Sequence, residues 1–280
     1  MLVGVAQLRP ELGRIEANLE RCEASLEEAA GRGCALVVLP ECAVSGYLFQ
    51  TPDEAEAAAQ EVPGLATEAL AAACARLGLH AVVGLLERDG DRLRNTAVLV
   101  GPDGLVGRYR KSHLPFLGVD RFVAPGDEPF VPFETPVGAV GIQICFDLRF
   151  PEGMRACALA GAELVAHPTN WPTAARPVAD FVTRTRALEN RVFLLTADRV
   201  GRERWAEFGG WSQIVDPGGR RLAEASEGRE GLLVAEIDPT EARAKDLVLS
   251  PGEYEMRLFE GRRPELYGGL VERSRELIAG

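Results

Sequence analysis

The stretch Val140-Gly-Ile-Gln-Ile-Cys145-Phe-Asp147-Leu-Arg-Phe-Pro-Glu152 decides the fold of this chain. An apolar run rich in β-branched residues ends at Cys145, and residues 153–160 then have the composition of a helix. A buried strand that leads into a helix is typical of an α/β sheet, which places its sites at the carboxyl ends of strands. The positive end of the following helical turn is expected to lower the pKa of the Cys145 thiol. Taken alone, the stretch still favours a buried structural cysteine, because most free cysteines pack as small apolar side chains.

Composition and charge indicate a globular protein that does not act on nucleic acid. The 280 residues are 46% hydrophobic and 26% charged, and the net charge of −11 disfavours nucleic acid and anionic membranes as partners. No apolar run is long enough to span a membrane, and the first residues predict a strand rather than a signal peptide. Six cysteines without disulfide-like spacing indicate a reducing, cytoplasmic setting. Three scattered histidines and the lack of a CxxC pair argue against a structural zinc site.

The order of the predicted elements indicates an α/β protein. Strands are expected at residues 2–8, 35–39, 80–86, 95–100, 105–111, 130–133, 137–144, 163–167, 192–197, 210–215, 221–225 and 232–237, and helices at 14–32, 53–60, 65–77, 153–161, 176–190 and 240–245. This order mixes helical crossovers with hairpins, which favours a mixed sheet or two packed sheets flanked by helices. Residues 198–209 are expected to form a loop. We expect a single domain over residues 1–250, and a charged tail over 251–280 that packs on a surface such as that of a partner subunit.

Three of the predicted strands end at a chemically reactive side chain, Glu41, Lys111 or Cys145. Each one alone is ordinarily a solvated strand end or a core residue, but neighbouring strands would bring all three to one edge. A carboxylate whose pKa is raised by burial can take the proton of a thiol. The ammonium of Lys111 and the backbone N–H of Phe146 are suited to stabilise the negative charge that develops on a substrate, with about 3–4 kcal/mol per donor.

Several blocks of the sequence occur in an order that is typical of one superfamily. The chain carries Leu39-Pro-Glu41, Asn95-Thr, Tyr109-Arg-Lys111, Cys145-Phe-Asp147, Pro168-Thr-Asn-Trp and further blocks at residues 186–190, 210–217 and 262–267. Together they resemble the signature of the nitrilase superfamily of carbon–nitrogen hydrolases, over nearly the whole chain. The resemblance implies an αββα sandwich of two mixed sheets flanked by helices, no metal or organic cofactor, and a homodimer or a larger homo-oligomer.

The same resemblance implies a role for each reactive residue. Cys145 would be the nucleophile, Glu41 the general base and Lys111 the stabiliser of the tetrahedral intermediate, and a thioester would form at Cys145. Nitrile-hydrolysing members typically carry Cys-Trp-Glu, whereas Cys-Phe-Asp is similar to the amidase and carbamoylase branches. We therefore expect a small amide or N-carbamoyl substrate, with a nitrile as the alternative and a catalytically inactive binding subunit as a further one.

The substrate would be recognised by loops around the three reactive residues. Tyr47, Asn170 and Trp171 are candidate binding residues, together with residues 114–122 and 199–208. Trp171 and Trp205 are equally compatible with a role as packing anchors.

One position departs from the superfamily pattern. Many amidases carry a second glutamate about nine residues after the lysine, and the nearest carboxylate here belongs to Asp120. It either replaces that glutamate or forms a loop ion pair with Arg121. A rival mechanism is that of a cysteine–histidine hydrolase, in which His113 or His167 would be the base.

Overall fold

Strand β1 (Leu2–Gln7) lies inside the first of two six-stranded sheets and is buried from Val3 onward. In the computed structural model, which describes residues 1–272, this sheet has the strand order β14-β1-β2-β3-β4-β5. The pairs β1–β2 and β2–β3 are parallel and the others antiparallel. The remaining strands are β2 (Cys34–Val38), β3 (His80–Asp89), β4 (Arg92–Gly101), β5 (Gly104–Arg110) and β14 (Gly231–Glu236).

The second sheet has the strand order β13-β12-β9-β8-β7-β6. Its central pairs β7–β8 and β8–β9 are parallel, and the outer pairs are antiparallel. The strands are β6 (Phe133–Thr135), β7 (Gly138–Ile142), β8 (Leu164–Thr169), β9 (Phe193–Asp198), β12 (Gln213–Val215) and β13 (Arg221–Glu224). Both sheets are therefore mixed, and they face each other, since β1 contacts β9 and β2 contacts β8.

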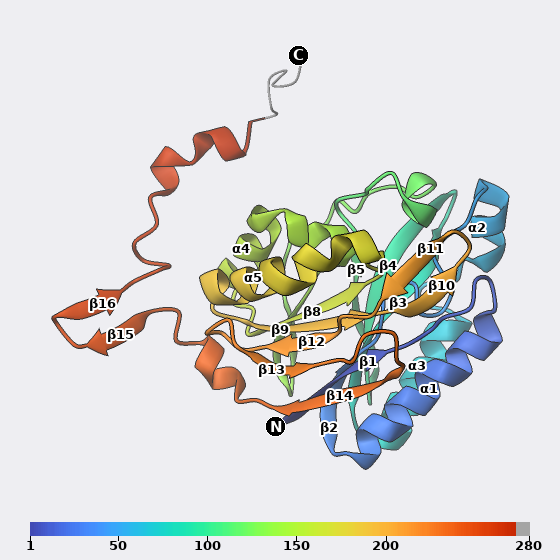
Figure 1. The fold of residues 1–280 in the computed structure, drawn as a ribbon, viewed down its shortest axis with the longest axis horizontal. Helices are drawn as coiled ribbons and strands as arrows, with labels where there is room; N and C mark the ends of the chain where they lie inside the picture. The colour runs from blue at the N-terminus through green and yellow to red at the C-terminus, as the bar shows by residue number, and fades with distance from the viewer. Residues whose placement is uncertain (273–280) are drawn as a thin grey trace. The chain divides into compact units, whose positions relative to one another are not determined.

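Helices cover the outer face of each sheet (Figure 1). Helix α1 (Ile15–Gly31) and helix α3 (Leu65–Leu77) pack on the first sheet, where Leu26 and Leu70 join one apolar cluster with Val37 and Val83. Helix α4 (Pro151–Leu159) and helix α5 (Thr183–Asn190) lie on the second sheet. A short helix, α2 (Pro52–Ala58), lies between β2 and α3 in the chain and contacts β3. The order helix–sheet–sheet–helix confirms the predicted αββα sandwich.

Several predicted elements differ from the observed ones. The helix expected at 176–190 is a π-helical segment, Val178–Val182, followed by α5, and the strand expected at 210–215 begins only at Gln213. The expected loop at 198–209 is largely an antiparallel hairpin of β10 (Val200–Glu203) and β11 (Ala206–Gly209), in which Val200, Glu203 and Phe208 are buried despite the charged composition. The strand expected at 130–133 begins only at Phe133, since Pro129 and Pro132 cannot donate to a ladder. The helix expected at 240–245 is a short 3₁₀ turn, Pro239–Ala242.

Contacts within the chain separate a unit of Met1–Arg243 from a second unit that begins at Ala244. The described part of the second unit contains a hairpin of β15 (Leu247–Ser250) and β16 (Tyr254–Met256), followed by two 3₁₀ turns. It exposes several large apolar side chains, Val248, Leu249, Tyr254, Leu266, Leu270 and Val271. Its role on a partner subunit stays a prediction. None of the helices in residues 1–272 is long and apolar enough to cross a membrane.

Candidate active site

The three predicted reactive residues follow strands of both sheets. Glu41 comes after β2 and Lys111 directly after β5, so the first sheet carries both. Cys145 comes after β7 of the second sheet and begins a 3₁₀ turn, Cys145–Arg149. The turn at Glu41 packs directly on β3, where a Cβ on Gly84 would come within 2.7 Å of the Glu41 Cα. Only glycine fits at this close approach of two backbones.

Lys111 is the buried cation of the site. Its Nζ donates to Oε1 of Glu41 at 2.6 Å and to Oδ2 of Asp120 at 2.6 Å, and all three side chains are fully buried. Burial opposes the charge of Lys111, but Asp120 and Glu41 outweigh it and hold the pKa of Lys111 well above its usual value. Lys111 is therefore a fixed ammonium, and the site carries two carboxylates for one cation.

Asp120 belongs to this cluster and not to an ion pair with its neighbour. It accepts hydrogen bonds from Tyr47 Oη at 2.8 Å and from Asn95 Nδ2 at 2.8 Å, in addition to the bond from Lys111. The guanidinium of Arg121 instead donates to the backbone carbonyls of Gly118 and Phe49. Of the two alternatives for Asp120, the structure shows the pairing with Lys111 and no ion pair with Arg121 among residues 1–272.

Asn95 is a member of the site that the sequence analysis includes in a superfamily block without assigning it a role. Its Nδ2 donates to Oε1 of Glu41 at 2.7 Å and to Asp120, so one amide bridges the two carboxylates. Its backbone carbonyl accepts the N–H of Lys111 at 2.8 Å. The signal in the sequence is a polar pair, Asn95-Thr96, within the buried run of β4.

Glu41 keeps one oxygen free of protein partners. Oε1 is held by Lys111 and Asn95, whereas Oε2 is buried and has no hydrogen-bond partner among residues 1–272. Burial raises the pKa of Glu41 above its usual value, with Lys111 opposing this shift and Asp120 adding to it. A desolvated carboxylate with one unoccupied oxygen is suited to accept a proton.

Cys145 has a strained backbone and a thiol whose pKa is raised. Its φ of +46° lies in the left-handed region, which costs a non-glycine residue of the order of 1 kcal/mol and is often found at functional sites. Burial and the charge of Glu41 raise the pKa of the Cys145 thiol, against the opposing effects of Lys111, Thr169 and Asn170. The pKa of Cys145 therefore lies above its usual value, contrary to the expectation that the following turn lowers it, and burial is the largest cause.

Both candidate histidine bases are engaged elsewhere. His113 Nδ1 lies 2.7 Å from Oδ1 of Asp147, and its ring stacks on Phe150 with centroids 3.8 Å apart. His167 Nε2 contacts the Cys145 carbonyl oxygen at 3.2 Å, and burial lowers the pKa of His167 to about 4. The imidazoles therefore support the backbone around the cysteine, and neither is directed at its sulfur by these contacts.

The predicted substrate-binding residues lie on the loops around the site. The phenol of Tyr47 is buried against Asp120. Both polar atoms of the Asn170 side chain are buried without a hydrogen-bond partner among residues 1–272. Trp171 is buried, and its backbone N–H donates to Oδ1 of Asp198 at 2.9 Å. Phe146 occupies the second position of the 3₁₀ turn, where a backbone N–H has no acceptor within the turn.

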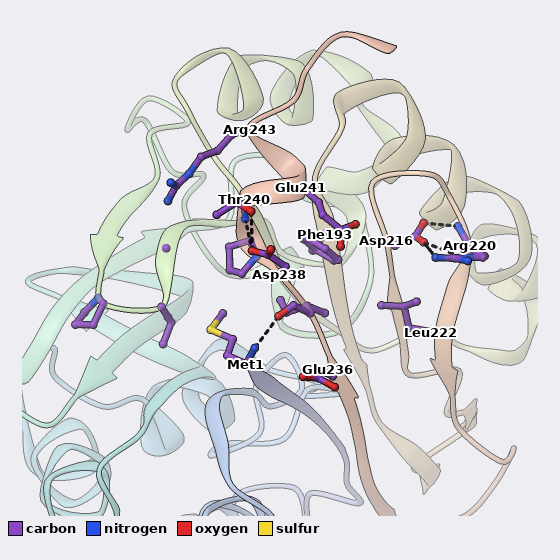
Figure 2. Close-up of a pocket in the computed structure, with 15 residues that line it drawn as sticks. Met1, Phe193, Asp216, Arg220, Leu222, Glu236, Asp238, Thr240, Glu241 and Arg243 are labelled. Carbon is purple, nitrogen blue, oxygen red and sulfur yellow. Dashed lines mark hydrogen bonds and ion pairs between the residues drawn. The ribbon is translucent and has the colours of Figure 1, made fainter. Parts of the chain in front are cut away.

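Several cavities lie outside this buried cluster. One of about 390 Å³ lies beside the segments that contain Tyr47 and Asp120 and the tip of the β10–β11 hairpin; its lining residues are Leu48, Phe49, Gln50, Phe116, Leu117, Gly118, Arg121 and Trp205. Another of about 700 Å³ lies at the amino-terminal ends of β1, β7 and β9 (Figure 2). Met1, Phe193, Glu236 and Asp238 line it, and none of the three reactive residues does. The reactive residues, in contrast, follow the carboxyl ends of their strands.

The comparisons with known proteins agree on one family. The family model for carbon–nitrogen hydrolases matches residues 2–245. The chain is 41% identical over 269 residues to a nitrilase from Pyrococcus abyssi, covering 95% of this chain and 98% of the relative. It is 36% identical over 235 residues to an omega-amidase from Xenopus laevis, covering 79% and 83%. A solved carbon–nitrogen hydrolase from Helicobacter pylori has a TM-score of 0.85 and 27% identity, covering 98% of this chain and 99% of that one.

Proposed function

The chain belongs to the carbon–nitrogen hydrolase family, and we propose that within this family it is an amidase that cleaves a small amide or N-carbamoyl compound through a Glu41–Lys111–Cys145 triad. The observation that carries the proposal is that the two carboxylate oxygens of Glu41 have different surroundings. One of its oxygens is held by Lys111 and Asn95, and the other is buried and open to a proton.

The first half-reaction acylates the enzyme. The thiol of Cys145 adds to the carbonyl carbon while Glu41 takes the thiol proton, which forms the C–S bond and places negative charge on the carbonyl oxygen. Lys111 and the N–H of Phe146 stabilise that oxygen. The C–N bond then breaks, and the proton moves from Glu41 to the nitrogen, so that ammonia or an amine leaves and a thioester remains.

The second half-reaction releases the acid. Glu41 takes a proton from water as the water oxygen adds to the thioester carbon. The C–S bond breaks, and the proton returns from Glu41 to the sulfur. A protonated resting thiol fits this cycle, because base-assisted attack needs no standing thiolate.

Asn170 supports an amide as the substrate. A primary amide offers one acceptor and two donors, and the buried side-chain amide of Asn170 offers the complementary set. A buried polar group without a protein partner costs free energy, which a bound amide would recover. Tyr47 and Trp171 complete the proposed binding residues, and we propose that the chain acts as a cytoplasmic homodimer on this small-molecule substrate.

Nitrile hydrolysis is the second candidate function. It is favoured by the 41% identity to a protein named as a nitrilase. Against it stands the sequence Cys-Phe-Asp at Cys145, which resembles the amidase and carbamoylase branches.

The test is a screen for ammonia release over primary amides, N-carbamoyl compounds and nitriles, with the Cys145→Ala variant as the control. We expect turnover of at least one amide or N-carbamoyl compound, and none by the variant. Turnover of nitriles alone would contradict the amidase assignment. Equal labelling of Cys145 and Cys22 by a thiol-reactive probe, with no turnover at all, would instead indicate an inactive binding subunit.

A further inference from the structure

The β10–β11 hairpin places a buried carboxylate on the backbone of the Tyr47 loop. Glu203 ends β10, and its Oε1 accepts the N–H of Tyr47 at 3.0 Å and the N–H of Leu48 at 2.6 Å. Glu203 is 156 residues away from Tyr47 in the sequence, so this is a tertiary contact between a hairpin and a loop. Two backbone donors on one oxygen fix the position and the direction of that loop.

The charge of Glu203 is balanced inside the protein. Its Oε2 accepts from Nη1 of Arg199 at 2.9 Å, and both side chains are buried. Arg199 also donates to the carbonyl oxygen of Pro10 at 3.0 Å and lies over the ring of Phe208, 4.4 Å from its centroid. The carboxylate is therefore held from behind by a cation that is itself fixed, and it has little freedom to move.

The contact continues into the cluster around Lys111. The phenol of Tyr47 donates to Oδ2 of Asp120 at 2.8 Å, and the same oxygen accepts from Lys111 at 2.6 Å. A displacement of the Tyr47 backbone would therefore be transmitted to the carboxylate that aligns the ammonium. Catalysis is sensitive to such displacements, since a misplacement of about 1 Å can cost roughly 100-fold in rate.

We propose that Glu203 is a positioning residue for the reaction. Through the backbone of Tyr47 it sets the alignment of Asp120 and Lys111, although it touches neither the substrate nor Cys145. The inference rests on the proposed function only in treating Lys111 as part of the reacting centre. It assigns to the hairpin a role in the rate of the reaction in addition to its role in the fold.

The test compares Glu203→Gln with Glu163→Gln as a matched control. Glu163 is also a buried carboxylate that accepts a backbone N–H, from Ala139, and pairs with an arginine, Arg243, but it lies outside the cluster around Lys111. For each variant, kcat, KM and the thermal midpoint are measured. The rate at which iodoacetamide alkylates Cys145 is followed by mass spectrometry, with Cys145→Ala as the blank.

We expect Glu203→Gln to lower kcat by roughly 10- to 100-fold with a smaller change in KM, and to slow the alkylation of Cys145 several-fold. Glu163→Gln should lower the thermal midpoint to a comparable extent while kcat stays within about twofold. The double variant Tyr47→Phe/Glu203→Gln should be no slower than the slower single variant, because both substitutions act through one contact. Independent, multiplying effects on kcat would overturn the proposal, as would an unchanged kcat in Glu203→Gln.

Glu203→Asp covers the case in which the glutamine variant does not fold. It keeps the charge opposite Arg199 but is one methylene shorter, so it should fold and still lose kcat; a normal kcat in this variant would refute the positioning role. If the wild-type enzyme released no ammonia from any compound, the proposed function would fail. The alkylation series would then still decide whether Glu203 positions the centre around Cys145.

Discussion

The ammonium of Lys111 lies 2.6 Å from a carboxylate oxygen of Asp120, at the place where the superfamily resemblance led us to expect a glutamate. Asp120 lies in a 3₁₀ turn, Gly118–Arg121, and this turn packs on Tyr47, because the N–H of Val119 donates to the Tyr47 carbonyl oxygen at 2.8 Å. Gly118 permits this approach, since a Cβ there would come within 2.6 Å of the Tyr47 ring.

Replacing Asp120 by asparagine should lower kcat by about 100-fold, because Lys111 would lose one of its two buried counter-charges and its alignment. Asp120→Glu keeps the charge and should retain more activity than the asparagine variant. Steady-state kinetics on the amide found in the screen measure both. Equal activity of wild type and Asp120→Asn would show that Asp120 only pairs with Lys111 structurally.

The two candidate bases can be separated by one substitution each. Glu41→Gln should lower kcat by a factor of the order of 10² to 10⁴, because the proton acceptor is lost. His113→Asn should leave kcat within about threefold, since His113 is engaged with Asp147. Near-normal turnover of the Glu41 variant, together with an inactive His113 variant, would favour the cysteine–histidine mechanism.

The charge around Glu41 should set the acid limb of the pH profile. Asn95→Asp would add a third carboxylate beside Glu41 and raise the pKa of Glu41 further, so this base would be protonated at a higher pH. The acid limb of kcat/KM should therefore shift to higher pH. Asn95→Leu removes the same donor, whose hydrogen bond lowers the pKa of Glu41, without adding charge, so it should shift the acid limb upward by a smaller amount. Equal shifts in the two variants would show that the added carboxylate has no effect of its own.

His167 should make the folded protein less stable in acid. Burial lowers its pKa from 6.5 to about 4, so the unfolded chain binds a proton below pH 6.5 that the folded chain takes up only near pH 4. The free energy of unfolding should therefore fall as the pH drops through this window, by up to about 3 kcal/mol in total from this group. Urea unfolding at pH 7.5 and pH 5 measures the loss. His167→Gln should reduce the difference between the two pH values by about 2 kcal/mol, and an unchanged difference would contradict the assignment.

The tail is expected to contribute to assembly. A chain that ends after Ser250 lacks most of the exposed apolar side chains of the second unit, including Tyr254, Leu266 and Leu270. Light scattering should then give a smaller particle than the full chain forms. If the shortened and the full chain formed particles with the same number of chains, the tail would not be an assembly element.

The superfamily resemblance predicted the αββα fold, and the strand ends led to the proposal of Glu41, Lys111 and Cys145 as reactive residues. Apolar runs that stop at Glu41, Lys111 and Cys145 are local patterns, and the superfamily blocks fix their order. Asn95 is quoted only as part of a superfamily block and receives no role, because a polar residue within a buried strand has no local mark that separates a site residue from a structural one. Glu203 was hidden in a charged stretch that was interpreted as a loop, and its partner lies far away in the sequence.

The pKa of Cys145 could not be predicted for a related reason. The local pattern contains the turn that favours a thiolate, whereas the desolvation that opposes it depends on how the two sheets pack. Composition near the cysteine carries no information about that packing. The same limit applies to Asp120, whose choice between Lys111 and Arg121 depends on the fold of the turn.

The base and the nucleophile stand on different sheets, since Glu41 and Lys111 follow strands of the first and Cys145 follows a strand of the second. Among residues 1–272 no strand of one sheet pairs with a strand of the other, apart from an isolated bridge between Leu8 and Arg199 just beyond β1 and β9. The apolar side chains packed between the sheets therefore contribute to the separation between the proton acceptor and the sulfur. The core of the sandwich thus affects the geometry of the active site as well as the stability of the fold. Substitutions in this core that leave the protein folded can therefore still lower the activity, because they change that separation.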